Sequence, residues 1–264
     1  HHDGCSIYDS KTSDYDIVDR TQFKRDPLQE LAAECKKAGL VLCFYHSILD
    51  WHHPMAKAGT WPQYVDVMKA QLKELLTNYG RIGVLWFDGE WDENWTEAQG
   101  KELYAFCRKL QPAVIINNRV GKGRNDMQGM NRYKDAAGDF CTPEQEIPSR
   151  GLPGVDWETC MTMNDTWGWR ADDTNWKSHD AMLRMLVDIV SKGGNFLLNV
   201  GPTANGKIPM ESVERLAAIG RWVAANGESI HGSQASPFER LTWGRCTQKP
   251  GRLYLHVFGW PKGG

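Results

Sequence analysis

Residues 84–91 read Val-Leu-Trp-Phe-Asp-Gly-Glu-Trp, an apolar run that stops at an acid. The run from Gly83 to Phe87 has the composition of a buried strand, and the glycine after Asp88 lets the backbone turn. Parallel α/β folds often place functional carboxylates at the carboxyl ends of their strands. Asp-Gly is also an ordinary turn signal, so this octapeptide alone leaves both interpretations of Asp88 open.

Strands and helices are expected to alternate on both sides of this stretch. Continuous apolar runs typical of buried strands occur at 40–45, 83–87, 113–116, 157–163 and 195–200. Apolar residues at helical spacing occur at 27–38, 61–79, 96–110, 180–191 and 209–225. This alternation predicts an α/β protein with a parallel sheet. Polar residues gather after the strands, as they do in (β/α) barrels whose loops carry the chemistry.

We expect a (β/α)8-like (TIM-type) barrel that lacks its first strands, because five strands rather than eight are recognisable. Residues 1–232 would form this partial catalytic barrel. Residues 233–264 would begin a C-terminal β-sandwich, since 241–246 and 252–258 alternate like antiparallel strands. The chain starts at His1 without a methionine, and we expect a fragment truncated at both ends.

Composition narrows the classes of partner. The 31 basic and 33 acidic residues give a net charge of -2, which offers no electrostatic argument for binding nucleic acid. No apolar run approaches about 18 residues, so no membrane span is expected.

The seven cysteines are scattered without metal-ligand spacing, and the adjacent pairs His1-His2 and His52-His53 are poorly arranged for one ion. We therefore expect no metal. The 12 tryptophans suit either core packing or platforms for sugars.

Carboxylates are the best candidates for chemistry. Asp88 ends a strand, and Glu144 and Glu146 lie in a loop expected at the same rim, whereas Glu158 begins a strand and would lie at the opposite end. Two carboxylates in an aromatic-rich cleft are what glycoside hydrolysis requires, one acting at the anomeric carbon and one as proton donor. A solvated loop acid is the alternative interpretation of Glu144.

A series of motifs in this order resembles the family 29 glycoside hydrolases, the α-L-fucosidases. The motifs are His-His-Asp-Gly (1–4), Tyr-His-Ser-Ile-Leu-Asp-Trp-His-His-Pro (45–54), Leu-Trp-Phe-Asp-Gly (85–89), Asn-Asn-Arg (117–119), Asp-Phe-Cys-Thr-Pro-Glu (139–144), Trp-Glu-Thr-Cys-Met-Thr-Met (157–163), Trp-Gly-Trp (167–169), Gly-Gly-Asn-Phe-Leu-Leu-Asn-Val-Gly-Pro (193–202) and Asn-Gly-Glu-Ser-Ile-His-Gly (226–232). They extend over nearly the whole chain.

The resemblance implies retaining exo-hydrolysis of terminal α-linked L-fucose, on a barrel followed by a β-sandwich, without metal or cofactor. The family's nucleophile falls on Asp88, and its general acid/base falls on Glu144. Glu158 and Glu146 stay open as alternatives for the acid/base. The implied partner is a fucosylated glycan or glycoside, and a non-catalytic fucose-binding protein or an inactive truncated homologue is the alternative function.

The resemblance also implies a set of fucose-binding residues: His1, His2, Tyr45, Trp86, Arg119 and Trp167. Phe44 is the alternative to Tyr45, because the alignment there needs a gap of one residue. Histidine and arginine can hydrogen-bond ring hydroxyls, and Trp167 can cover the apolar face that carries the C6 methyl group. Arg119 near Asp88 would keep that acid ionised. The family suggests a secreted, periplasmic or lysosomal location, with no signal here that selects among them.

Overall fold

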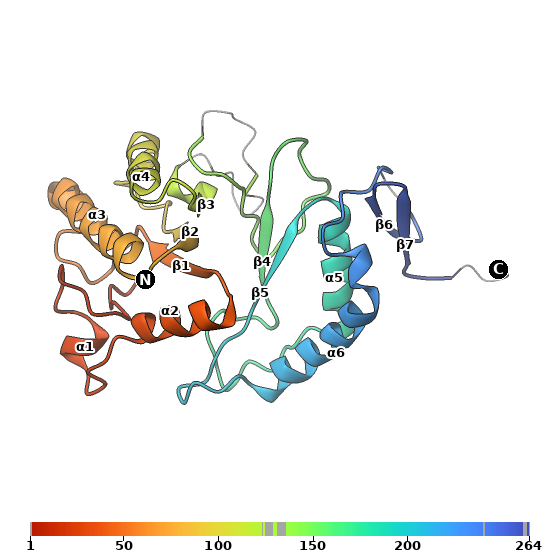
Figure 1. Cartoon of the computed structure of the whole chain (residues 1–264), viewed down its shortest axis with the longest axis horizontal. Helices are drawn as coiled ribbons and strands as arrows, with labels where there is room; N and C mark the ends of the chain where they lie inside the picture. The colour runs from red at the N-terminus through yellow and green to blue at the C-terminus, as the bar shows by residue number, and fades with distance from the viewer. Residues whose placement is uncertain are drawn as a thin grey trace. The chain divides into compact units, whose positions relative to one another are not determined.

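The computed structural model describes residues 2–122, 124, 129–130, 136–239, 241–260 and 263. The chain divides into two compact units, one comprising His1–Arg124 with Asn131–Cys141 and the other Asn125–Met130 with Thr142–Gly264. Both units contain helices and strands, so the predicted α/β class is confirmed (Figure 1).

The first unit is built on a three-stranded parallel sheet in the order β1-β2-β3. Its strands are β1 (Leu42–Ser47), β2 (Ile82–Asp88) and β3 (Ile115–Ile116). Its helices are α1 (Ile17–Arg20), α2 (Pro27–Ala38), α3 (Trp61–Asn78) and α4 (Glu97–Leu110), with short 3-10 turns at η1 (Ala58–Thr60) and η2 (Asn118–Val120). The predicted elements of this part of the chain are present, with ends shifted by a few residues.

Local chemistry explains where two of these helices begin. Asp26 caps α2 by accepting a hydrogen bond from the Gln29 amide at 3.0 Å. Thr96 and Gln99 form a reciprocal capping box at the start of α4. These signals fix the helix starts by short-range contacts, so they could be recognised in the sequence.

The two faces of the sheet differ. Successive side chains of a strand point to opposite faces, and Phe44, Leu85 and Phe87 lie on the face packed against the helices. The other face of β1 carries Cys43 and Tyr45, which are exposed. The expectation that residues 40–45 form a buried strand therefore holds for one face of β1 only, because the second face lines the site described below.

The second unit pairs β4 (Glu158–Thr162) with β5 (Asn195–Asn199) in parallel, and α5 (His179–Ser191) lies between them in sequence. Next come α6 (Met210–Asn226), η3 (Gly227–Ser229), and the antiparallel hairpin of β6 (Gly244–Lys249) and β7 (Arg252–Val257). Asp188 of α5 binds Lys192 at 3.0 Å and Arg245 of β6 at 2.5 Å. The antiparallel pairing expected beyond Gly232 is present, while barrel closure, the sandwich and the boundary at residue 232 stay predictions.

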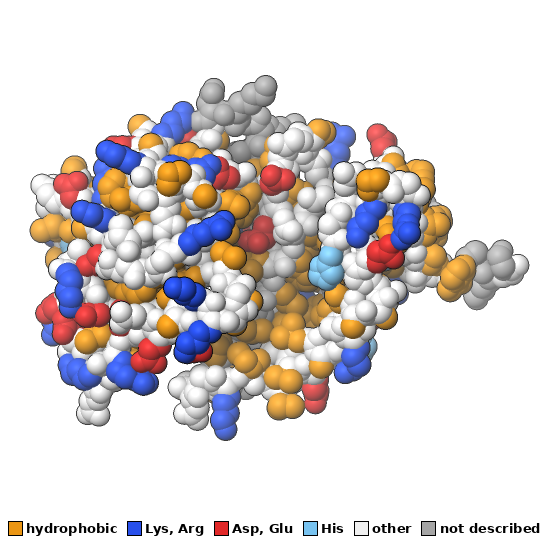
Figure 2. Space-filling view, viewed as in Figure 1, with side chains coloured by type: hydrophobic (Ala, Val, Ile, Leu, Met, Phe, Trp, Pro, Cys, Tyr) orange, Lys and Arg blue, Asp and Glu red, His pale blue; other side chains and the backbone are white. Residues whose placement is uncertain are grey.

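The surface carries charges of both signs. On the face shown in Figure 2, basic side chains (blue) and acidic side chains (red) are interspersed. In the part of the chain that the structure describes, no helix is both long and apolar enough to cross a bilayer.

Gly89 makes the turn that ends β2. Its φ is +86°, in the left-handed region that favours glycine. A Cβ at this position would lie 2.6 Å from the backbone nitrogen of Leu49. The same turn brings the carbonyl of Asp88 within 2.7 Å of the Ile48 amide, which donates to it. A residue without a side chain is therefore needed directly after Asp88.

Replacing Gly89 by alanine tests this packing. Gly39→Ala is the matched control, because Gly39 also has a positive φ of 67°, but a Cβ there would meet no atom of the described residues within 4 Å. Both variants incur the left-handed penalty of about 1–2 kcal/mol. Gly89→Ala should lower the free energy of unfolding, measured in urea, by roughly a further 1–3 kcal/mol from the steric clash. Equal losses in the two variants would contradict the close approach to Leu49.

Candidate functional site

The site of the first unit centres on the carboxylate of Asp88, whose side chain is 13% exposed. Arg119 Nη1 donates to Asp88 Oδ1 at 2.7 Å, and the Tyr45 hydroxyl donates to Oδ2 at 2.7 Å. His2 Nε2 lies 3.4 Å from the same Oδ2. Both carboxylate oxygens are thus held by side chains from three separate segments.

Sheet register explains how Tyr45 reaches Asp88. Tyr45 of β1 lies opposite Trp86 of β2, and Ser47 lies opposite Asp88. Residues two apart on a strand share a face, so these four side chains line one side of the β1–β2 pair. Phe44, the alternative to Tyr45, is buried in the core on the other face.

Arg119 is placed by the segment that follows β3. The side chain of Asn117 accepts from the Phe87 amide and donates to the Phe87 carbonyl, both at 2.8 Å. The side-chain amide thus takes the place of a strand backbone beside β2. Arg119 follows in η2 and is 1% exposed. Its guanidinium lies 4.4 Å from the centre of the Trp86 ring, a cation–π contact. Tyr45 stacks on the same indole, with ring centres 5.7 Å apart and planes at 19°.

These contacts determine the ionisation of Asp88. Burial raises its pKa, but the hydrogen bond with His2, the positive charge of Arg119 and the hydrogen bond from Tyr45 outweigh burial and lower the pKa to about 2. Asp88 is therefore an anion throughout the physiological pH range. It suits a nucleophile or an electrostatic stabiliser and not a proton donor.

His2 joins this site to a cluster of aromatic rings. Its Nδ1 lies 2.6 Å from Ser47 Oγ, and its carbonyl accepts from the Trp51 amide at 2.7 Å. The Ser47 hydroxyl also donates a hydrogen bond to the carbonyl of Leu49. The imidazole centre lies 5.2 Å from the ring of Trp51 and 5.4 Å from that of Trp91. The carboxylate is thus bordered by flat apolar surfaces.

Glu90 is a buried acid beside the site, and no residue pattern in the sequence assigned it a role. The residue is 6% exposed, and its Oε1 lies 3.0 Å from Nη1 of Arg124. Burial raises the pKa of Glu90, while the charges of Arg119 and Arg124 oppose that rise. Its position two residues after Asp88, between Gly89 and Trp91, was the available signal.

The other predicted acids belong to the second unit. Glu144 is half-buried and forms a parallel bridge with Cys160 in the middle of β4. The flanking Gln145 amide donates to the Cys160 carbonyl at 2.9 Å. Glu146 accepts through its carbonyl from Thr159 Oγ1 at 2.7 Å, and Glu158 is the first residue of β4. Glu144 therefore lies further along β4 than Glu158 does, toward its carboxyl end.

Trp167 also lies in the second unit, beside the end of β5. Its carbonyl accepts from Asn199 Nδ2 at 2.8 Å, and the residue is 41% exposed. The structure thus gathers His2, Tyr45, Trp86 and Arg119 around Asp88, and it places Glu144 and Trp167 in the other unit. His1 lies outside the described residues.

No metal centre was found among the described residues, since they contain no group of three or more His, Cys, Asp or Glu side chains arranged to hold an ion.

These observations define an α/β protein with an ionised carboxylate, an arginine and aromatic rings at the ends of parallel strands. Such a set of groups suits a sugar. The sequence model of the alpha-L-fucosidase family matches residues 1–228, and the chain belongs to that family.

Relatives and solved structures agree with this assignment. The chain is similar to an alpha-L-fucosidase of Dictyostelium discoideum (31% identical, 100% of this chain, 59% of the relative) and to the human tissue alpha-L-fucosidase (29%, 100% and 58%). It superposes on alpha-L-fucosidase isoenzyme 1 from Paenibacillus thiaminolyticus with a TM-score of 0.89 (40% identity, 100% of this chain, 67% of that chain).

A second solved structure is that of a GH29 alpha-L-fucosidase from Bacteroides thetaiotaomicron, described as a trapped covalent intermediate with 2-fluoro-fucosyl fluoride. It matches with a TM-score of 0.88 at 29% identity, over 99% of this chain and 64% of that chain. The present chain spans about 60% of the length of the curated relatives.

Removing the Tyr45 hydroxyl tests the electrostatics of the site. In Tyr45→Phe the pKa of Asp88, followed by carboxyl ¹³C chemical shift, should rise above the wild-type value of about 2, because one hydrogen bond to the anion is lost. Tyr104→Phe is the control, since that hydroxyl donates to Asp139 at 2.6 Å and not to Asp88. An unchanged Asp88 pKa in Tyr45→Phe would contradict the geometry.

The same shift has a consequence for stability. A pKa below the unfolded value near 3.9 means that ionised Asp88 stabilises the fold fully above about pH 4, by about 2 kcal/mol. This contribution is lost as the pH falls toward 2. In Tyr45→Phe the pKa of Asp88 is lowered less, so the free energy of unfolding, measured in urea, should fall less between pH 4 and pH 2 than it does in the wild type.

Proposed function

We propose that the protein is a retaining exo-α-L-fucosidase that removes terminal α-linked L-fucose from glycans or glycosides. The observation that carries this proposal is the Asp88 carboxylate, kept anionic by Arg119, Tyr45 and His2 next to exposed aromatic rings. Family membership supports the choice of fucose among sugars.

In the first step, an Asp88 oxygen attacks C1 of fucose and forms a covalent ester. The bond between C1 and the glycosidic oxygen breaks, and Glu144 gives its proton to that oxygen. The low pKa of Asp88 ensures that the nucleophile is ionised before substrate arrives. Because Oδ2 is the oxygen contacted by both Tyr45 and His2, these donors can transfer their hydrogen bonds to the sugar as charge leaves the carboxylate.

In the second step, Glu144 takes a proton from water as the water oxygen attacks C1. The ester bond breaks, and Asp88 leaves as a carboxylate. A carboxylate whose anion is strongly stabilised is a good leaving group, so the contacts of Arg119 that lower its pKa also favour this step. The Bacteroides structure described as a trapped covalent intermediate supports a two-step route by analogy.

The remaining predicted residues would bind the sugar. His2 and Arg119 offer hydrogen-bond donors for ring hydroxyls, and Trp86 and Trp167 offer apolar faces. The finer architecture belongs to the same proposal. Residues 1–232 would be part of a (β/α) barrel, as the parallel strand pairs suggest, and residues 233–264 would begin a β-sandwich, as the β6–β7 hairpin suggests.

Asp88→Ala tests the nucleophile. In the protein at its natural length, kcat for an aryl α-L-fucoside should fall by about 10⁴-fold or more, because no covalent step is possible. Added azide should restore turnover by occupying the vacated space, and the product should be β-fucosyl azide. Asp92→Ala in the following loop is the control and should keep activity. Comparable activity of Asp88→Ala and wild type would refute the assignment, and fucose binding without turnover in the wild type would favour a non-catalytic role.

Glu144→Ala tests the general acid/base. Loss of proton donation should lower kcat/KM by about 10²–10⁴-fold for poorly activated alkyl fucosides, and much less for a fluoride or nitrophenyl leaving group. Glu146→Ala and Glu158→Ala serve as parallel comparisons. If the leaving-group-dependent loss occurs in one of these variants and not in Glu144→Ala, that residue is the acid/base.

A further inference from the structure

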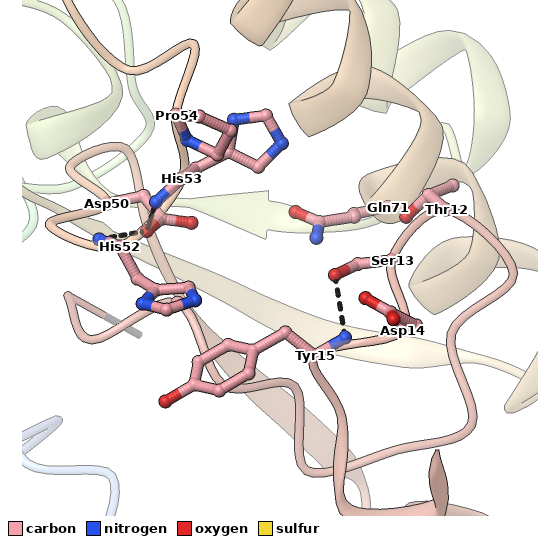
Figure 3. Close-up of a pocket in the computed structure, with 10 residues that line it drawn as sticks. Thr12, Ser13, Asp14, Tyr15, Asp50, His52, His53, Pro54 and Gln71 are labelled. Carbon is pink, nitrogen blue, oxygen red and sulfur yellow. Dashed lines mark hydrogen bonds between the residues drawn. The ribbon is translucent and has the colours of Figure 1, made fainter. Parts of the chain in front are cut away.

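A pocket in the first unit has no assigned role, and none of its described lining residues is among the residues that contact Asp88. It has a volume of about 340 Å³ and lies between the loop at residues 12–15, the loop at residues 50–54 and helix α3 (Figure 3). This volume is at the lower end of the range for small-ligand sites, about 300–1,000 Å³. It has room for one sugar ring and not for an extended chain.

The pocket walls are held by specific contacts. Asp50 Oδ1 accepts from the amides of His52 and His53, both at 2.8 Å, which fixes the second loop. The Tyr15 ring stacks on the His52 ring with centres 4.0 Å apart and planes at 21°. Gly4, with φ of +73°, lies so close that a Cβ would be 2.4 Å from Asp50 Oδ1. The pocket is therefore bounded by mutually supporting segments.

The lining chemistry suits a neutral polyhydroxylated ligand. Hydroxyl, amide, imidazole and carboxylate groups come from Thr12, Ser13, Gln71, His52 and Asp50. Figure 3 shows Gln71 extending from α3 between the two loops. Among the ten described residues that line the pocket there is no lysine or arginine, and the Asp50 carboxylate adds negative charge, so anionic ligands are disfavoured.

A short structural path connects the pocket to the proposed nucleophile. Trp51 lies between two lining residues, Asp50 and His52, and its side chain is 71% exposed. Its amide donates to the carbonyl of His2 at 2.7 Å, and His2 contacts Asp88. A ligand that extends from Asp88 past Trp51 would enter this pocket.

We propose that this pocket binds the neutral sugar to which the fucose is attached, an inference that rests on the proposed fucosidase function. The stacked Tyr15 and His52 rings form one wall for the sugar ring, and Gln71 and Asp50 bind its hydroxyls. The leaving sugar is thereby selected by hydrogen bonds and by the absence of a cationic group among these lining residues.

The test compares two substrates in the protein at its natural length. Fucosyl fluoride places no sugar in the pocket, whereas fucosyl-N-acetylglucosamine does. Gln71→Ala and His52→Ala should lower the ratio of kcat/KM for the disaccharide to kcat/KM for the fluoride by about three- to tenfold, the effect of one lost hydrogen bond. Gln63→Ala, on an exposed position of the same helix, is the matched control and should leave the ratio unchanged. An unchanged ratio in both pocket variants would overturn the proposal.

A binding measurement separates this proposal from the proposed function. Free N-acetylglucosamine should shift the imidazole ¹H–¹⁵N signals of His52, and a sulfated N-acetylglucosamine should do so less strongly. No shift at His52 at high concentrations of the neutral sugar would overturn the pocket assignment even if fucosyl fluoride is hydrolysed. If the wild type hydrolyses neither substrate, the fucosidase function fails, and the leaving-sugar role of the pocket fails with it.

Discussion

The buried ion pair of Arg119 and Asp88 is the interaction on which the site depends. An arginine that is 1% exposed has lost its hydration, and that loss is compensated only by close, well-oriented partners. Asp88 at 2.7 Å and the indole of Trp86 at 4.4 Å provide them. The pair therefore serves two purposes at once, because it allows the arginine to be buried and holds the proposed nucleophile in its anionic form.

The sheet makes this pair possible through its two unlike faces. One face of β1 and β2 packs against helices through residues such as Phe44 and Phe87, which gives the strands a rigid base. The opposite face carries Tyr45 and Asp88 in adjacent register positions. Since the strand period is two, a single continuous apolar sequence supplies both the core and the site. The polar and aromatic residues on the site face are thus held in place by the core packing on the opposite face of the same strands.

Parts of the site differ from the structure that the sequence pattern predicts. The apolar run at 113–116 suggested a full strand, but only Ile115–Ile116 pairs, because the Val114 amide donates to the carbonyl of Gln111 in a turn. Asn117 then continues the pairing with its side chain, a role that residue type alone does not reveal. Glu90 also differs from expectation. An acid after a glycine suggests a solvent-exposed loop, but Glu90 is buried and forms an ion pair with the equally buried Arg124.

The sequence by itself determined the helices, the main strands and the candidacy of Asp88, because periodicity, caps and turn glycines act over a few residues. The motif series indicated the family and the candidate catalytic and sugar-binding residues. Only the tertiary structure decided which groups meet at the carboxylate, since Arg119 and Tyr45 are 31 and 43 residues from Asp88 along the chain. It also decided that Asp88 has a pKa of about 2, that Glu90 is buried, and that a pocket lies beside Trp51. Burial and charge are properties of the assembled neighbourhood, and no local pattern of residues contains them.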